Sequence, residues 1–267
     1  MNNQQLNVLS KFEAMQKQLK QRGKLWDSWP SDELYNKCSG VIPWKVYTIW
    51  AYSNVWKSKF AYWHVAYFLK QGKKVLIINL EVDAAHCFMN ILQAVNKLNY
   101  KEVMDYKLTD DDIDFYSNLT ITDDLYKLDD IVNKIESEHY DIVFIDFVQN
   151  IEWKGMGDYE KNATVAKTIQ RTAIKTGSTI YSLSQLSNSV GKDVYYGNTD
   201  FISLKWSGEY YASSDVIFIL SRNNNDNEMI VKISKNKYGR NGWEFAFDVD
   251  FARNQFTFKR TNDGLDD

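Results

Sequence analysis

The sequence predicts one α/β domain with a mostly parallel central sheet, flanking helices and antiparallel strands at its C-terminal end. Between residues 46 and 184, short apolar runs alternate with stretches of helical periodicity, which is the order of a parallel sheet with right-handed crossovers. After Asp215 the helical stretches stop, and short strands follow one another across tight turns. A chain of 267 residues with 44% hydrophobic residues can bury such a core.

The first segment predicts an amphipathic helix. Over residues 2–22, apolar side chains recur at three- and four-residue steps, and Gly23 follows as a stop signal. This helix could pack on its own domain or on a neighbouring subunit, and the sequence favours neither. We assign residues 1–39 to this helix and a connector, residues 40–262 to the α/β domain and residues 263–267 to a tail.

The elements of the parallel part follow in order. Strands are predicted at residues 46–50, 74–80, 117–122, 141–145 and 179–184, and helices at residues 57–71, 84–98, 126–137 and 158–176. Several of these strands are apolar along their length, as expected when both faces of a sheet are covered. In the last helix, the residues expected to face the core are Val165, Ile169, Ala173 and Ile174.

The C-terminal part is predicted as hairpins. Strands are expected at residues 216–221, 228–234, 242–248 and 255–259, with turns at 223–227 and 251–254. Such hairpins extend a parallel core with antiparallel strands. The sequence shows neither an internal repeat nor a linker that would demand a second domain.

Composition narrows the class of protein. The net charge of −3 argues against a surface that binds nucleic acid everywhere, but it permits a local basic lining. Cys38 and Cys87 stand in unrelated segments without metal-ligand spacing, which indicates a reduced, cytoplasmic setting. No apolar run reaches the length of a membrane span, so no membrane partner is expected. Aromatic residues make up 15% of the chain and suit either core filling or base stacking.

The turn after the first predicted strand carries the main chemical signal. A phosphate-binding loop would read G-x-x-x-x-G-K-S/T there, and the sequence reads Ala51-Tyr52-Ser53-Asn54-Val55-Trp56-Lys57-Ser58. Lys57 and Ser58 stand at a helix start, where backbone N–H groups and the helix dipole favour anions. Both glycines are absent, and Trp56 opposes close wrapping of the main chain around phosphate oxygens.

Polar side chains also follow three later strands. Glu81 comes after the second strand, Asp146 after the fourth and Gln185 after the fifth, at the edge where α/β folds bind ligands. An acid that ends an apolar strand is the form expected of a carboxylate bound through water to Mg²⁺. A basic turn follows at residues 235–242, which is either a solvated turn or a source of cations for a neighbour's phosphates.

Taken in order, these segments resemble a known family. The series NLEV at 79–82, DIVFIDFVQ at 141–149, STIYSLSQLS at 178–187, SGEYYASSDVIFILSR at 207–222 and KNKYGRNG at 235–242 is similar to the motif set of DnaB-type replicative helicase ATPase domains. The resemblance covers roughly residues 40 to 260 and implies a RecA-like P-loop fold. It also implies ATP and Mg²⁺ as cofactors, although the missing glycines argue against nucleotide binding.

The resemblance assigns a role to each site residue. It implies Lys57 on the β- and γ-phosphates, Glu81 as activator of water, Gln185 as γ-phosphate sensor, and Ser58 with Asp146 on the metal. The loop residues Ser53, Asn54, Val55 and Trp56 would line the nucleotide. Lys235 and Lys237 stand where the family offers Lys-x-Arg to the adjacent subunit, and Arg240 could substitute for the missing arginine.

The resemblance also implies partners. The family binds single-stranded DNA through loops in the channel of a ring, which here are residues 152–162 and 187–206, with Lys154, Lys192 and Lys205 as backbone contacts. A homo-oligomeric ring, a hexamer in the family, and contacts with replication proteins are therefore expected.

Three functions remain open. Retention of Lys57, Glu81 and Asp146 favours an ATP-dependent DNA helicase subunit. Trp56 and Ala51, together with lysine in place of the family's arginine at Lys237, favour a catalytically silent RecA-fold module that binds DNA or protein. A recombinase-like or KaiC-like ATPase of the same superfamily is the third alternative.

Overall fold

The computed structural model describes residues 29–38, 40–52, 55–153, 157–186, 208–223 and 227–263. The predicted N-terminal helix lies outside these ranges. The elements in chain order are α2 (Asp32–Cys38), β1 (Val46–Ala51), α3 (Lys57–Lys70), β2 (Val75–Asn79), α4 (Ala84–Asn96), α5 (Tyr100–Met104), α6 (Asp110–Tyr116), β3 (Leu119–Thr122), α7 (Leu128–Ser137), β4 (Ile142–Asp146), η1 (Val148–Asn150), α8 (Asp158–Thr176), β5 (Thr179–Gln185), α10 (Gly208–Ser213), β6 (Val216–Asn223), β7 (Glu228–Asn236), β8 (Glu244–Asp250) and β9 (Gln255–Asn262).

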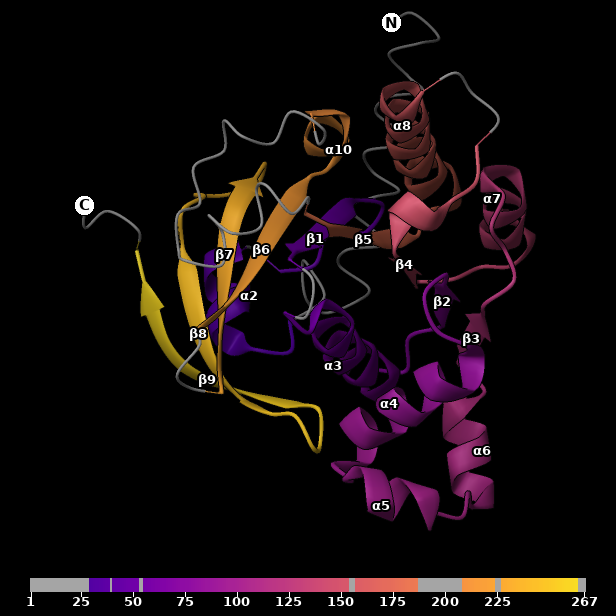
Figure 1. Cartoon of the computed structure of the whole chain (residues 1–267), viewed down its shortest axis with the longest axis vertical. Helices are drawn as coiled ribbons and strands as arrows, with labels where there is room; N and C mark the ends of the chain where they lie inside the picture. Colours follow the sequence, from indigo (N-terminus) through magenta and orange to yellow (C-terminus); the bar gives the residue numbers. More distant parts are fainter. Residues whose placement is uncertain are drawn as a thin grey trace, which may run out of the picture.

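The strands form a single mixed sheet. Within the described ranges, nine strands lie in the order β3-β2-β4-β5-β1-β6-β7-β8-β9 (Figure 1). The strands β3, β2, β4, β5, β1 and β6 run parallel to one another. Strands β7, β8 and β9 continue the sheet in antiparallel fashion. The predicted mostly parallel sheet with antiparallel C-terminal strands is confirmed.

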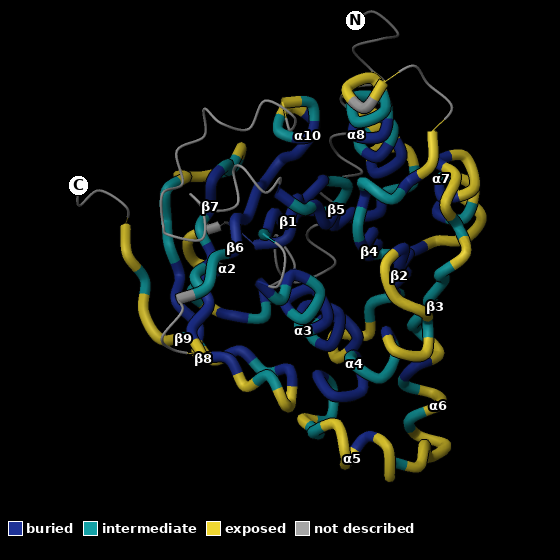
Figure 2. Tube along the Cα trace, viewed as in Figure 1, coloured by how far each residue is buried: buried dark blue, intermediate teal, exposed yellow. Residues whose placement is uncertain are grey.

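Helices cover both faces of the parallel part. In β1, Tyr47 and Ile49 belong to a core with Phe60 of α3, whereas Val46 and Trp50 belong to a core with the residues of α7 and α8. Figure 2 shows the central strands buried between these layers, and every residue of β1, β2 and β4 is buried. This two-sided burial explains why the strands are apolar along their whole length.

One predicted core residue is on the surface. The prediction for Ile174 was wrong, since its side chain is 65% exposed, whereas Val165, Ile169 and Ala173 are buried. The buried three recur every four residues and therefore share one face of α8. Ile174 follows Ala173 directly, and one residue turns the helix by about 100°, which carries its side chain away from the sheet.

The described part of the predicted connector packs into the domain. Trp29 and Leu34 are buried in the same core as β1 and α3. The Trp29 ring lies edge-on to the rings of Tyr47 and Phe218, with centroids 5.3 and 5.0 Å away. These aromatic side chains fill the core, so the high aromatic content is explained at least here by packing.

Candidate functional site

The carboxyl ends of neighbouring strands bring the predicted site residues to one edge of the sheet. Ala51 of β1 lies opposite Gln185 of β5, and Asn79 of β2 lies opposite Asp146 of β4. Because these strands are parallel and adjacent, the segments that follow them meet at the same edge. Lys57, which begins α3 directly after the β1 turn, therefore lies beside Asp146.

Lys57 and Asp146 form a buried ion pair. The Lys57 Nζ lies 2.6 Å from Asp146 Oδ1, and the two residues are 9% and 2% exposed. The ammonium also lies 4.7 Å from the centroid of the Phe147 ring. A buried pair of this kind holds both side chains in place, because removing either partner leaves the other charge buried and alone.

Trp56 adopts the left-handed backbone conformation. Its φ is 58° and its ψ is 34° at the N-cap of α3, a conformation that glycine adopts without a steric cost and other residues seldom adopt. Its indole contacts Arg222, with Cζ 3.7 Å from the ring centroid, and Phe251, with the two centroids 3.5 Å apart. The neighbouring Val55 is buried, and its N–H donates to the Tyr52 carbonyl at 3.3 Å.

The segment that carries Glu81 is held by Asn79. The buried Asn79 side chain accepts the N–H of Glu81 at 3.1 Å and of Val82 at 3.0 Å, and it donates to Tyr62 Oη at 3.0 Å. The Leu80 N–H donates to the Asp146 carbonyl at 2.6 Å. Glu81 itself is exposed. The sequence prediction missed the role of Asn79, although a polar residue at the end of an apolar strand was a visible signal.

Gln149 ties the end of β5 to the segment after β4. Its Nε2 donates to Ser184 Oγ at 2.6 Å and to the Gln185 carbonyl at 2.9 Å, and its Oε1 accepts the Gln185 N–H at 3.3 Å. The backbone of Gln185 is therefore fixed beside η1, at the same edge as Asp146. Sequence reasoning did not single out Gln149, because its partners are 35 residues away.

The basic turn lies at the opposite edge of the sheet. Asn236 at the end of β7 pairs with Val216 at the start of β6, and β6 is parallel to β1, so residues 237–243 lie at the amino edge of the parallel strands. Lys237 Nζ lies 3.1 Å from Oδ1 of the buried Asp215. The Arg240 guanidinium donates to the Asp263 carbonyl at 2.9 Å. The structure therefore does not bring Lys237 and Arg240 to the Lys57 site of their own chain.

Several predicted residues cannot be placed. Ser53, Asn54, Lys154, Lys192 and Lys205 lie outside the described residues. The predicted loop 152–162 is described in part. The Trp153 side chain is 41% exposed, and Lys161 Nζ donates to the Gln149 carbonyl at 2.8 Å. A pocket of about 540 Å³ opens beside them, lined by Lys127, Leu128, Asp129, Glu152, Trp153 and Lys161.

The donor set suits a Mg²⁺ ion that arrives with phosphates. Ser58 in the first turn of α3 supplies a hydroxyl, and Asp146 supplies a carboxylate. Mg²⁺ is often held by one or two protein oxygens, with waters and phosphate oxygens completing the octahedron. Within the described ranges, no group of three or more His, Cys, Asp or Glu residues could hold a metal ion. The residues present therefore fit a metal–nucleotide complex better than a metal cage made by the protein.

Comparison with known proteins identifies the family. The family described as "DnaB-like helicase C terminal domain" matches residues 31–260. The chain belongs to this family. Nothing among the curated proteins matches the sequence.

Solved structures show the same fold as this DnaB-like domain. The ATPase domain of G40P aligns with a TM-score of 0.77 and 16% identity, covering 97% of this chain and 100% of that chain. A structure described as a DnaB-like replicative helicase and its interactions with primase aligns with a TM-score of 0.73 and 18% identity, covering 87% of this chain and 61% of that chain. The predicted RecA-like fold is confirmed. No helix in the described segments has the length and apolar character needed to cross a membrane.

Proposed function

We propose that this DnaB-like domain is an ATP-dependent DNA helicase subunit that acts on single-stranded DNA in replication and works in a homo-oligomeric ring. The observation that carries the proposal is the Lys57–Asp146 pair at the start of α3, with Nζ and Oδ1 2.6 Å apart. Glu81 follows β2 and Gln185 ends β5, and these strands end at the same edge. A cation, a metal-binding carboxylate and a second acid at a helix start are the parts that phosphoryl transfer needs.

Each residue has a defined task in this proposal. The N–H groups of the first turn of α3 and the Lys57 ammonium bind the phosphates of ATP, while Ser58 and Asp146 hold Mg²⁺. The bound metal would neutralise charge on the phosphates. Glu81 is exposed at the sheet edge, and it orients a water and accepts its proton. Gln185, whose backbone Gln149 fixes, contacts the terminal phosphate.

A nucleotide titration tests the proposal. We expect an ATP analogue to bind in the presence of Mg²⁺ in calorimetry, and we expect single-stranded DNA to stimulate ATP turnover. Lys57→Ala should abolish binding, whereas Glu81→Gln should keep binding and lower turnover by roughly 10²- to 10⁴-fold, the usual contribution of a general base. Lys101→Ala on α5, which alters an exposed lysine outside the site, should change neither.

A second candidate is favoured by Trp56. Trp56 directly precedes Lys57 in the chain, and its indole packs against Arg222 and Phe251, so the chain could be a catalytically silent module that binds DNA or protein. No analogue binding at millimolar concentration, with DNA or protein binding retained, would support this module and overturn the helicase proposal. A monomeric mass at high concentration, with and without nucleotide and DNA, would contradict the ring.

A further inference from the structure

The Trp56 indole contacts the side chains of Arg222 and Phe251. Both are of a kind that stacks on flat rings. The Arg222 Cζ lies 5.7 Å from the centroid of Phe251, and the Trp56 ring is closer to each of them, at 3.7 and 3.5 Å. The indole thus contacts both a guanidinium and a phenyl ring, which do not lie directly opposite each other across it. We propose that Trp56 is an autoinhibitory plug, whose indole occupies the slot for the base of a nucleotide and must leave before nucleotide binds. This inference rests on the proposed function.

The walls of the slot have the chemistry of a base-stacking site. Arginine guanidinium groups and phenyl rings both stack on aromatic bases. Within the described residues, the Nε of Arg222 is buried and has no hydrogen-bond partner. An indole offers no acceptor atom, because its only nitrogen is a donor, whereas every nucleobase carries ring or carbonyl acceptors. A base in the slot would therefore stack on the guanidinium as the indole does, and its edges would add acceptor atoms that the indole lacks.

The slot lies within reach of the phosphate site. Trp56 immediately precedes Lys57 in the chain. The turn that carries Phe251 is hydrogen-bonded to helices α3 and α4. Lys59 Nζ donates to the Phe251 carbonyl at 3.4 Å, and Gln93 Nε2 donates to the Ala252 carbonyl at 3.0 Å. A nucleotide whose phosphates bind at the start of α3 could therefore place its base against Arg222.

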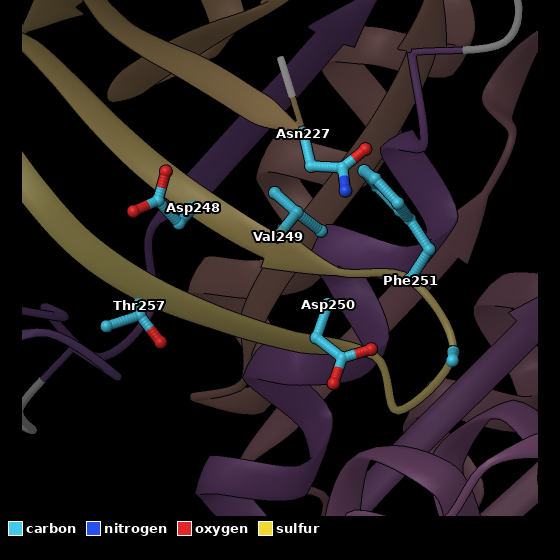
Figure 3. A pocket seen from close by; sticks show the side chains of 7 residues that line it. Asn227, Asp248, Val249, Asp250, Phe251 and Thr257 are labelled. Carbon is cyan, nitrogen blue, oxygen red and sulfur yellow. The ribbon is translucent and has the colours of Figure 1, made fainter.

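Phe251 has room to move when a base replaces the indole. Face-to-face stacking on both walls needs about 7 Å between them, two van der Waals separations, which is more than the present 5.7 Å. A pocket of about 560 Å³ lies along Phe251, lined by Asn227, Asp248, Val249, Asp250, Phe251, Ala252 and Thr257. Figure 3 shows the Phe251 and Asn227 side chains, both of which line this pocket.

The backbone of Trp56 also favours its release. A φ of 58° is unfavourable for a tryptophan, so the contacts of the indole hold the residue in a strained conformation. Glycine at this position would empty the slot and remove the strain at once. Trp56→Gly is therefore expected to fold, and Trp56→Ala, which empties the slot without removing the strain, is a second variant.

Binding of three ligands tests the plug. Adenosine probes the slot alone, inorganic tripolyphosphate with Mg²⁺ probes the phosphate site alone, and an ATP analogue with Mg²⁺ probes both. We expect Trp56→Gly to bind adenosine and the analogue about tenfold more tightly than the unmodified chain, as stacking of one base allows. Tripolyphosphate affinity should change by less than about twofold. Adding Phe251→Ala to Trp56→Gly should remove most of the gain, and Trp153→Gly should give none.

The outcomes separate the plug from the proposed function. Thermal unfolding first shows that the unmodified chain, Trp56→Gly and Trp56→Ala are all folded. If these three proteins then bind adenosine with equal affinity, the plug is overturned. A gain in adenosine affinity without tripolyphosphate binding to any variant would support the slot and overturn the phosphate site. Gains in adenosine and analogue affinity with tripolyphosphate binding unchanged would support both.

Discussion

At the residue scale, His64 is a basic group held neutral inside the aromatic core. Its side chain is fully buried against Trp29 and Phe60, and its Nδ1–H donates to the Phe60 carbonyl at 2.9 Å. Burial lowers the pKa of the imidazole from 6.5 to about 4. Since the unfolded chain takes up this proton below pH 6.5 and the folded chain does not, stability is complete above pH 6.5 and falls as the pH drops towards 4.

This titration predicts a pH-dependent stability. Between pH about 7.5 and about 5, the free energy of unfolding should fall by about 2 kcal/mol because of His64. Urea unfolding of the unmodified chain and of His64→Phe at both pH values measures the difference, because the variant lacks the group. His139→Asn, which changes an exposed histidine, should keep the full pH dependence. An unchanged pH dependence in His64→Phe would contradict the prediction.

Individual site residues differ in how far sequence predicts them. Asp146 and Gln185 end strands β4 and β5, and Lys57 begins the helix that follows β1, so the common direction of these strands brings all three to one edge, as expected from the sequence. Gln149 was missed because its partners lie 35 and 36 residues later in the chain, whereas Asn79 was missed although its place at the end of an apolar strand was a signal. The contact between the Trp56 indole and the Phe251 ring could not be predicted either, because Phe251 lies 195 residues later in the chain and only the fold brings the two side chains together.

At the element scale, α8 ends in a left-handed glycine that contacts an indole. Gly177 has a φ of 79°, and a Cβ there would lie 3.0 Å from Trp44 Nε1. Gly72, after α3, has a φ of 69° with nothing within 4 Å of such a Cβ. Gly72→Ala should cost about 1 kcal/mol through backbone strain alone. Gly177→Ala should cost at least about 1 kcal/mol more through overpacking.

The two glycine variants control for each other. Chemical denaturation measures both losses under the same conditions, and among the neighbours of an added Cβ the two sites differ only in the contact with Trp44. Equal losses in Gly72→Ala and Gly177→Ala would show that the indole moves away freely, and the packing argument would then fail.

Long elements were predicted to within a few residues, whereas short ones were missed. Helices α5 and α6 have 5 and 7 residues, too few for an apolar periodicity to stand out. Both nevertheless begin with a capping box, Asn99 with Glu102 and Thr109 with Asp112. That local pattern stabilises a helix start without any tertiary contact, so it was the available sequence signal for these helices.

At the scale of the whole molecule, the site and the basic turn lie at opposite edges of the sheet. Lys57 lies at the carboxyl edge of the parallel strands, and Arg240 follows a strand that ends at the amino edge. If Arg240 contributes to catalysis, it must do so in a neighbouring subunit. The sequence order alone could not show this separation, because it follows from the antiparallel pairing of β7 with β6.

Mixed oligomers test this arrangement. Lys57→Ala subunits and Arg240→Ala subunits should each lack ATP turnover, but an equal mixture should recover about a quarter of the unmodified rate, because that share of interfaces pairs an intact Lys57 with an intact Arg240. Steady-state turnover after subunit exchange measures the recovery. Lys57→Ala subunits taken through the same exchange procedure without Arg240→Ala subunits give the baseline rate. No recovery above this baseline would contradict a role for Arg240 across the interface.

Under the proposed function, the 2.6 Å contact between Lys57 and Asp146 makes the site selective for a metal ion and phosphates together. A metal ion alone would displace the ammonium from the carboxylate and leave a buried cation without a partner. Phosphates alone would draw the ammonium away and leave a buried carboxylate without one. Only the two together satisfy both side chains, so under the proposed function we expect the site to bind Mg²⁺ with phosphates and to reject either component by itself.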